Sequence, residues 1–169
     1  YGMTLTLSPE LDQVEWFGRG PHESYADRKT GAAVGTYRSA VADLYTPYIR
    51  PQENGNRTDV RWVALTSEAG VGLLAAADPV MEFSALLNDD EDFDEGERPT
   101  HRHAWDIIPR DHVTLDLELG QMGVGGETSW GARPHPEYRL PAGNHEYRIR
   151  LVPFDPRTRD PGPLSRQRW

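Results

Sequence analysis

The fold class is decided by residues 112–119, which read His112-Val113-Thr114-Leu115-Asp116-Leu117-Glu118-Leu119. Each odd-numbered position in this stretch is apolar, and each even-numbered position is polar or charged. Successive side chains of a β-strand point to opposite faces, so a period of two places one face in a core and the other in water. We therefore predict a half-buried β-strand at residues 112–119.

Related patterns run along most of the chain. We predict further strands at residues 4–7, 11–17, 32–37, 59–66, 70–77, 81–87 and 146–151. The 16 glycines and 14 prolines among the 169 residues favour short elements joined by turns over long helices. Seven or eight short strands, with no long stretch of helical period, predict an all-β fold: an antiparallel β-sandwich or barrel.

The acidic run at residues 88–97 lacks this alternation, and we expect it to be a solvated loop. A calcium loop of the helix–loop–helix kind needs glycine at its sixth position and glutamate at its twelfth. Counting from Asp90, these positions hold Glu95 and His101, so the calcium interpretation fails. His101 and His103 would share one face of an extended segment as two zinc ligands could, but we favour structural histidines because no spacing selects a third ligand.

The domain organisation follows from where the strand patterns end. No linker and no internal repeat divides the chain, so we expect one β-sandwich domain over residues 1–154. Residues 155–169 are rich in proline and arginine, and we expect them to form a loosely attached tail.

Composition excludes several classes of function. The chain has 18 lysines and arginines against 27 acidic residues, a formal charge of −9, and phosphate binding needs clustered cations, so we expect no nucleic-acid partner. No apolar run approaches the roughly 18 residues of a membrane helix, and no signal segment opens the chain. The absence of cysteine excludes disulfides and a thiol nucleophile, and we expect a cytoplasmic location.

The most informative loop begins with Gly123-Val124-Gly125-Gly126. A dinucleotide-binding turn would open a helix, and Glu127, Trp130 and two prolines follow instead, so we reject that interpretation. The glycines allow a sharp turn that presents Glu127 to Trp130, and loops lie on protein surfaces. Trp130 is therefore either an exposed indole that receives the apolar face of a sugar or an indole folded back onto the sandwich, and spacing alone leaves both open.

No complete active site is visible in the sequence. There is no GxSxG nucleophile motif, and Ser129 has no evident histidine and aspartate partners. A retaining glycosidase needs two carboxylates about 5 Å apart, and no pair of acids here is marked by its neighbours.

Four segments, in order, resemble the large β-galactosidases of glycoside hydrolase family two. They are VEWFGRGPHESYADR at residues 14–28, YTPYIRPQENGNR at 45–57, THRH at 100–103 and QMGVGGETSW at 121–130. They are similar to that family's GPxExYxDR, YxPYxxPxENGxR, HRH and MGxGGxxSW segments. The resemblance covers roughly residues 5 to 154 and is to the C-terminal small-chain domain, not to the catalytic barrel.

The resemblance implies a fold and a function. It implies part of a galactose-mutarotase-like antiparallel supersandwich, namely its C-terminal half. It implies hydrolysis of terminal β-D-galactosides with retention, by catalytic glutamates on a barrel domain that is absent here. Trp130 matches the tryptophan that stacks on the bound sugar, with Glu127 and Gly126 as the other predicted substrate-binding residues. We expect no catalytic residue, metal ligand or cofactor in this stretch; divalent and monovalent cations belong to the complete enzyme.

Further expectations concern partners and stability. We expect Arg28 and Arg57 to pair with Glu23, Asp27 or Glu53, and we expect the isolated chain to be inactive and to self-associate through uncovered strand edges. Two other functions stay open: a stand-alone galactose-binding module, and an aldose 1-epimerase-like domain with Glu127 and His101 or His103 as acid and base. A fold alone does not license the second of these.

Overall fold

A computed structural model describes residues 1–94, 102–126, 128 and 130–167. The described residues are organised around seven strands: β1 (Gly2–Leu7), β2 (Gln13–Gly20), β3 (Ala33–Ala40), β4 (Arg57–Thr66), β5 (Gly72–Leu86), β6 (Val113–Glu118) and β7 (Arg148–Phe154). Helical segments are short: the 3₁₀ turns η1 (Val41–Leu44), η2 (Ala104–Asp106) and η3 (Pro136–Tyr138), and the helices α1 (Asp90–Phe93) and α2 (Pro161–Ser165). The prediction of an all-β fold is confirmed.

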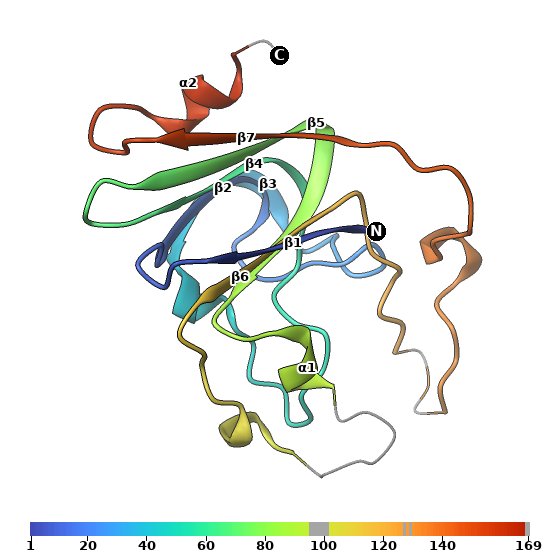
Figure 1. Ribbon diagram of the computed structural model, residues 1–169. Helices are drawn as coiled ribbons and strands as arrows, with labels where there is room; N and C mark the ends of the chain where they lie inside the picture. The colour runs from blue at the N-terminus through green and yellow to red at the C-terminus, as the bar shows by residue number, and fades with distance from the viewer. Residues whose placement is uncertain (95–101, 127, 129, 168–169) are drawn as a thin grey trace.

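All seven strands belong to one antiparallel sheet (Figure 1). Its order is β1-β6-β5-β4-β2-β3, and β7 pairs with β5 on the same side as β6. Strand β5 is long enough for both neighbours, because its first half pairs with β7 and its second half with β6. The two strands predicted at residues 70–77 and 81–87 are therefore one. Strand β4 pairs with both halves of β5, with register shifts around Val60.

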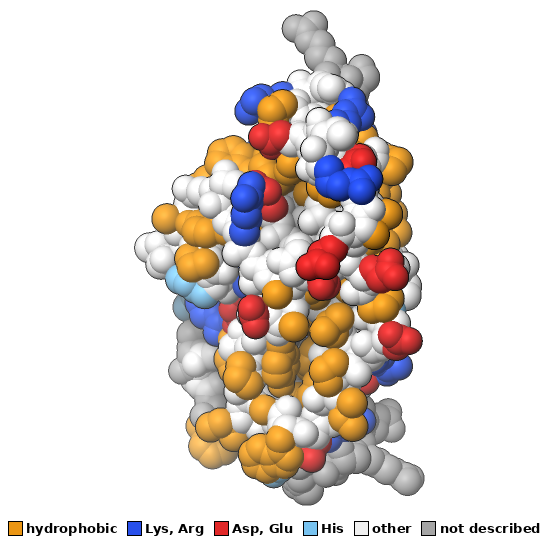
Figure 2. Space-filling view, turned by 90° about the vertical axis from the view of Figure 1, so that its left-hand side faces the viewer, with side chains coloured by type: hydrophobic (Ala, Val, Ile, Leu, Met, Phe, Trp, Pro, Cys, Tyr) orange, Lys and Arg blue, Asp and Glu red, His pale blue; other side chains and the backbone are white. Residues whose placement is uncertain are grey.

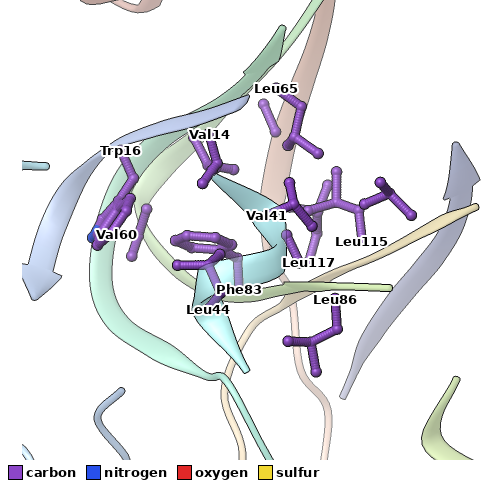
Figure 3. Close-up of a cluster of buried hydrophobic side chains, with 14 of the residues drawn as sticks. Val14, Trp16, Val41, Leu44, Val60, Leu65, Phe83, Leu86, Leu115 and Leu117 are labelled. Atoms are coloured by element: carbon purple, nitrogen blue, oxygen red, sulfur yellow. The ribbon is translucent and has the colours of Figure 1, made fainter. Parts of the chain in front are cut away.

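The sheet curls, so that β1 and β6 face β2 and β4 across the main core (Figures 1 and 3). Trp16, Val60, Phe83, Leu115 and Leu117 meet there, each at most 1% exposed. The indole of Trp16 meets the ring of Phe83 edge-on, with centroids 5.8 Å apart. Full burial of such side chains contributes about 1.5–3 kcal/mol each. The alternation of residues 112–119 thus faces its apolar side into this core, as predicted.

A second, smaller core lies on the other face of β4 and β5. It consists of Trp62, Ala64, Leu74, Ala76, Phe154 and Leu164. Leu164 comes from α2 and is 3% exposed. Its carbonyl and that of Ser165 accept hydrogen bonds from the guanidinium of Arg150. The expectation of a loosely attached tail is therefore wrong for α2, because one apolar side chain fixes it to the sheet. The division at residue 154 stays a prediction.

The acidic run is also better ordered than its charge indicated. Residues 90–93 form α1, and Phe93 is 7% exposed, with its ring stacked on Tyr45 at 6.0 Å. Asp89 accepts hydrogen bonds from His112 and Thr114. The expectation of a solvated loop is wrong for this part of the run; residues 95–97 lie outside the described residues. None of the helices in the described part has the length and apolar character needed to span a bilayer.

Candidate functional site

The first two motifs meet at the carboxylate of Glu23. This side chain is buried and accepts hydrogen bonds from the backbone N–H of Gly55 at 2.9 Å and from the hydroxyl of Tyr48. Arg28 forms an ion pair with Glu23 at 2.5 Å, and its guanidinium lies over the ring of Tyr25, 5.0 Å from the centroid. The predicted pairing of Arg28 is confirmed. The contacts of Glu23 with Tyr48 and Gly55 span 25 and 32 residues and join the two motifs.

Arg57 has a different environment from the one we expected. It is 3% exposed, donates hydrogen bonds to the carbonyls of Gly55 at 2.5 Å and Pro21 at 3.2 Å, and lies over the indole of Trp16. Burial lowers the pKa of Arg57 to about 10, so the guanidinium stays charged at neutral pH. Among the described residues no ion pair links it to a carboxylate, so the expected ion pair is wrong here.

Glu82 of β5 connects the second motif to the glycine-rich loop. Its Oε2 accepts hydrogen bonds from Nδ2 of Asn56 at 2.9 Å and from the backbone N–H of Gln121 at 3.2 Å. The same Asn56 amide donates to the carbonyl of Ser24 at 3.1 Å. Burial raises the pKa of Glu82 to about 7, although both hydrogen bonds act to lower it. The glycine-rich loop is therefore attached to β5 at Gln121, where it begins.

Asp27, from the first motif, holds the glycine-rich turn itself. Its Oδ1 accepts a hydrogen bond from the N–H of Val124 at 3.1 Å, and its Oδ2 accepts one from the N–H of Gly125 at 2.8 Å. Gly125 and Gly126 have φ values of +71° and +105°, in the left-handed region that glycine adopts without steric cost. These two glycines lie five and four residues before the predicted sugar-binding tryptophan.

Trp130 lies on the surface with 93% of the residue exposed. Its backbone N–H donates to Oγ1 of Thr128 at 3.3 Å, and Gly131 follows with φ +78°. Of the two placements left open by the sequence, the structure has the exposed one. Gly126 is also exposed, with open space where a side chain would stand. Glu127 and Ser129 lie outside the described residues, so the predicted role of Glu127 stays a prediction.

The histidines near residue 102 are only partly within the described residues. His103 is exposed and stacks on Trp105, with ring centroids 4.5 Å apart, and His101 lies outside the described residues. Within the described part of the chain, no three His, Asp or Glu side chains are arranged to hold a metal ion. Glu127, the group assigned to acid/base work in an epimerase, lies outside the described residues, so that alternative stays a prediction.

Sequence reasoning missed an acidic cavity beside the start of the loop. It has a volume of about 490 Å³ and is bordered by five carboxylates, those of Glu53, Asp90, Asp94, Asp116 and Glu118. Burial raises the pKa of Glu118, and the charge of Asp116 contributes in the same direction. The acids come from three separate segments, namely the loop before β4, α1 with the residue after it, and β6, so no local pattern marks them as neighbours.

Fold and loop together define an all-β domain that presents a tryptophan on an anchored, glycine-rich turn. Residues 1–151 match the family model described as "Beta galactosidase small chain", and the chain belongs to this family. Its relatives include a β-galactosidase of Priestia megaterium, 42% identical over 146 residues, and those of Vibrio cholerae and Lactobacillus delbrueckii subsp. bulgaricus, each 37% identical.

These alignments cover most of this chain and little of each relative. They include 86%, 89% and 90% of this chain, respectively. The chain spans about 14% of the length of each of these three curated relatives.

Proposed function

We propose that this chain is a sugar-contacting part of a β-galactosidase that hydrolyses terminal β-D-galactosides. In this proposal Trp130 provides a flat apolar platform on which the sugar stacks. The observation that carries the proposal is the 93% exposure of Trp130 on a turn held by Asp27. An indole in that position does not pack in a hydrophobic core. An exposed aromatic face is, however, available to contact a ligand.

The chemistry of the reaction belongs to other parts of the enzyme. Hydrolysis with retention needs a nucleophilic carboxylate and an acid/base carboxylate about 5 Å apart on either side of the scissile bond. We assign both to a barrel domain outside this chain, in keeping with the 14% of the relatives' length that the chain spans. In the complete enzyme the chain orients the sugar, and the isolated chain hydrolyses nothing.

The neighbouring residues complete the proposed contact. Gly126 leaves open space beside the turn, so a ligand can approach the backbone closely. We assign Glu127 as an acceptor for sugar hydroxyl groups, and the barrel domain as the partner that faces this loop. The reaction needs no cofactor from this chain in the proposal, and we place the enzyme in the cytoplasm.

Exchange of domains tests the proposal. The matching 146 residues of the Priestia megaterium relative are replaced by this chain, and hydrolysis of a chromogenic β-galactoside is measured. Stacking worth about 1–2 kcal/mol predicts that Trp130→Ala lowers kcat/KM roughly 5- to 30-fold. Trp105→Ala is the matched control, because Trp105 is 77% exposed but lies on η2. Equal kinetics for Trp130→Ala and the control would overturn the proposal.

A stand-alone galactose-binding module is the second candidate, and the same exposed indole favours it. We then expect a dissociation constant in the millimolar range, about 4 kcal/mol of binding free energy. Titration of the 169-residue chain with galactose, followed by indole fluorescence, distinguishes the candidates. A saturable change that disappears in Trp130→Ala supports the module, and no change up to high sugar concentration contradicts it.

A further inference from the structure

Asp27 uses both oxygens of its carboxylate on one turn. The N–H groups of Val124 and Gly125 are consecutive along the backbone, and each donates to a different oxygen, at 3.1 Å and 2.8 Å. The two partners lie 97 and 98 residues from Asp27 in the sequence. Hydrogen bonds to an ionised acceptor are about twice as strong as neutral ones. One side chain therefore fixes two adjacent peptide groups.

Gly123 leaves the room that this carboxylate occupies. A Cβ atom at Gly123 would stand 2.5 Å from Oδ2 of Asp27, 2.7 Å from its Cγ and 2.9 Å from Cβ of Tyr138. The φ of Gly123 is not in the left-handed region, so the glycine is needed here for close approach and not for an unusual backbone. The N–H of Gly123 donates to the carbonyl of Tyr138 at 2.7 Å, which holds the turn from the other side.

Asp27 itself stands on a fixed base. Tyr25 and Arg28 exchange backbone hydrogen bonds of 3.2 Å and 2.8 Å around it. Tyr25 is 1% exposed, and Arg28 is paired with the buried carboxylate of Glu23. The backbone on both sides of Asp27 is thus held by the protein interior, so its carboxylate is presented to the turn in one position.

We propose that Asp27 is the positioning residue of the tryptophan loop, residues 121–130. It sets the direction in which the turn delivers Trp130, five residues after Gly125, and it does so without touching the sugar. The proposal rests on the sugar-binding role of Trp130. Without the carboxylate, a turn that contains three glycines has many backbone conformations available and holds the indole in no single place.

The test uses the ¹⁵N-labelled 169-residue chain and the variants Asp27→Ala and Asp27→Asn. Hydrogen exchange is measured at the amides of Val124 and Gly125. The NMR order parameter of the Trp130 indole N–H bond is measured in the same samples. For Asp27→Ala we expect at least about tenfold faster exchange at both amides and a loss of indole order. Asparagine retains one acceptor oxygen, so for Asp27→Asn we expect one of the two amides to stay protected.

Two further variants guard against a general loss of structure. Asp43→Ala removes an exposed carboxylate on η1 and should change nothing in the loop. Gly123→Ala keeps Asp27 but places a methyl group against its carboxylate, so it should release the same two amides. The indole N–H of Trp16, which donates to the carbonyl of Arg19 at 2.9 Å, reports whether the core is intact.

The outcomes separate this inference from the proposed function. Unchanged amide exchange and unchanged Trp130 order in Asp27→Ala, with the Trp16 signal intact, would overturn the role of Asp27. The sugar-binding role of Trp130 would be overturned if galactose changed the indole signal of Trp130 neither in the isolated wild-type chain nor in the domain-exchanged enzyme. The amide exchange decides the first question whatever the answer to the second.

Discussion

The carboxylate of Glu82 accepts a hydrogen bond from the backbone N–H of Gln121 at 3.2 Å, 39 residues further along the chain. This contact attaches the beginning of the tryptophan loop to the long central strand β5. Together with the contacts of Asp27 to Val124 and Gly125, it fixes the loop at two points before Trp130.

The free energy of unfolding should depend on pH because of Glu82. Burial raises the pKa of Glu82 from 4.5 to about 7 in the folded chain, so the folded state holds the proton more tightly than the unfolded state. The stabilisation from the bound proton of Glu82 is therefore fully present below pH 4.5 and is lost as the pH rises through 7, on the order of 3 kcal/mol. Urea unfolding of wild type and Glu82→Gln between pH 4.5 and 7.5 measures it. We expect a falling curve for wild type and a flatter one for the variant; parallel curves would contradict this.

The buried carboxylate of Glu23 should matter more than an exposed ion pair. Glu23→Gln removes the charge that binds Arg28 and Gly55, and we expect it to lower the free energy of unfolding by about 2–3 kcal/mol. Glu15→Gln is the control, since its partner Arg38 is 78% exposed and such pairs contribute about 0–1 kcal/mol. Urea denaturation measures both, and equal losses would show that burial of Glu23 is unimportant.

The anchoring of α2 predicts a core-like effect near the C-terminal end. Leu164→Ala should lower the free energy of unfolding by about 2–4 kcal/mol, because it leaves a cavity among Trp62, Leu74 and Phe154. Arg166→Ala, at an exposed neighbouring position, should have little effect. Thermal unfolding of both variants tests this. A melting curve for Leu164→Ala identical to that of wild type would contradict the anchoring of α2 and support a loosely attached tail.

The isolated chain should self-associate. Strand β1 is at one end of the sheet order, and Met3 on it is 39% exposed. Hydrophobic side chains also gather on the lower part of the face shown in Figure 2. A lysine at an open edge opposes pairing with another strand, so Met3→Lys should reduce association. Val71→Lys changes an equally apolar, 57% exposed residue between β4 and β5 and serves as the control. Light scattering that finds a monomer for wild type at high concentration would contradict the prediction.

Turnover by the isolated chain should be absent. We propose that the nucleophile and the acid/base lie outside this chain, so a chromogenic β-galactoside should be hydrolysed no faster than in buffer. The domain-exchanged enzyme described above is the positive control. Hydrolysis by the purified 169-residue chain, retained in Trp130→Ala, would show that catalytic groups had been overlooked.

Most strands could be predicted because their signal is local. The alternation of Val113, Leu115 and Leu117 identified β6 within a few residues, since the pleat of a strand needs no distant partner to set its period. The division of β5 was wrong because the polar residues around Asp78 resemble a turn, while pairing with β4 continues past them. Phe93 and Leu164 were missed because each is a single apolar residue among charges and prolines.

The sequence by itself determined the all-β class and the family, because periodicity and contiguous motifs are properties of neighbouring residues. Only the tertiary structure decided that Trp130 is exposed and that Asp27 holds the turn before it. The physical reason is that these facts depend on strand order and on the curl of the sheet, which bring together groups nearly 100 residues apart. The sequence alone does not indicate that a carboxylate and a glycine-rich turn so far apart along the chain will be in contact.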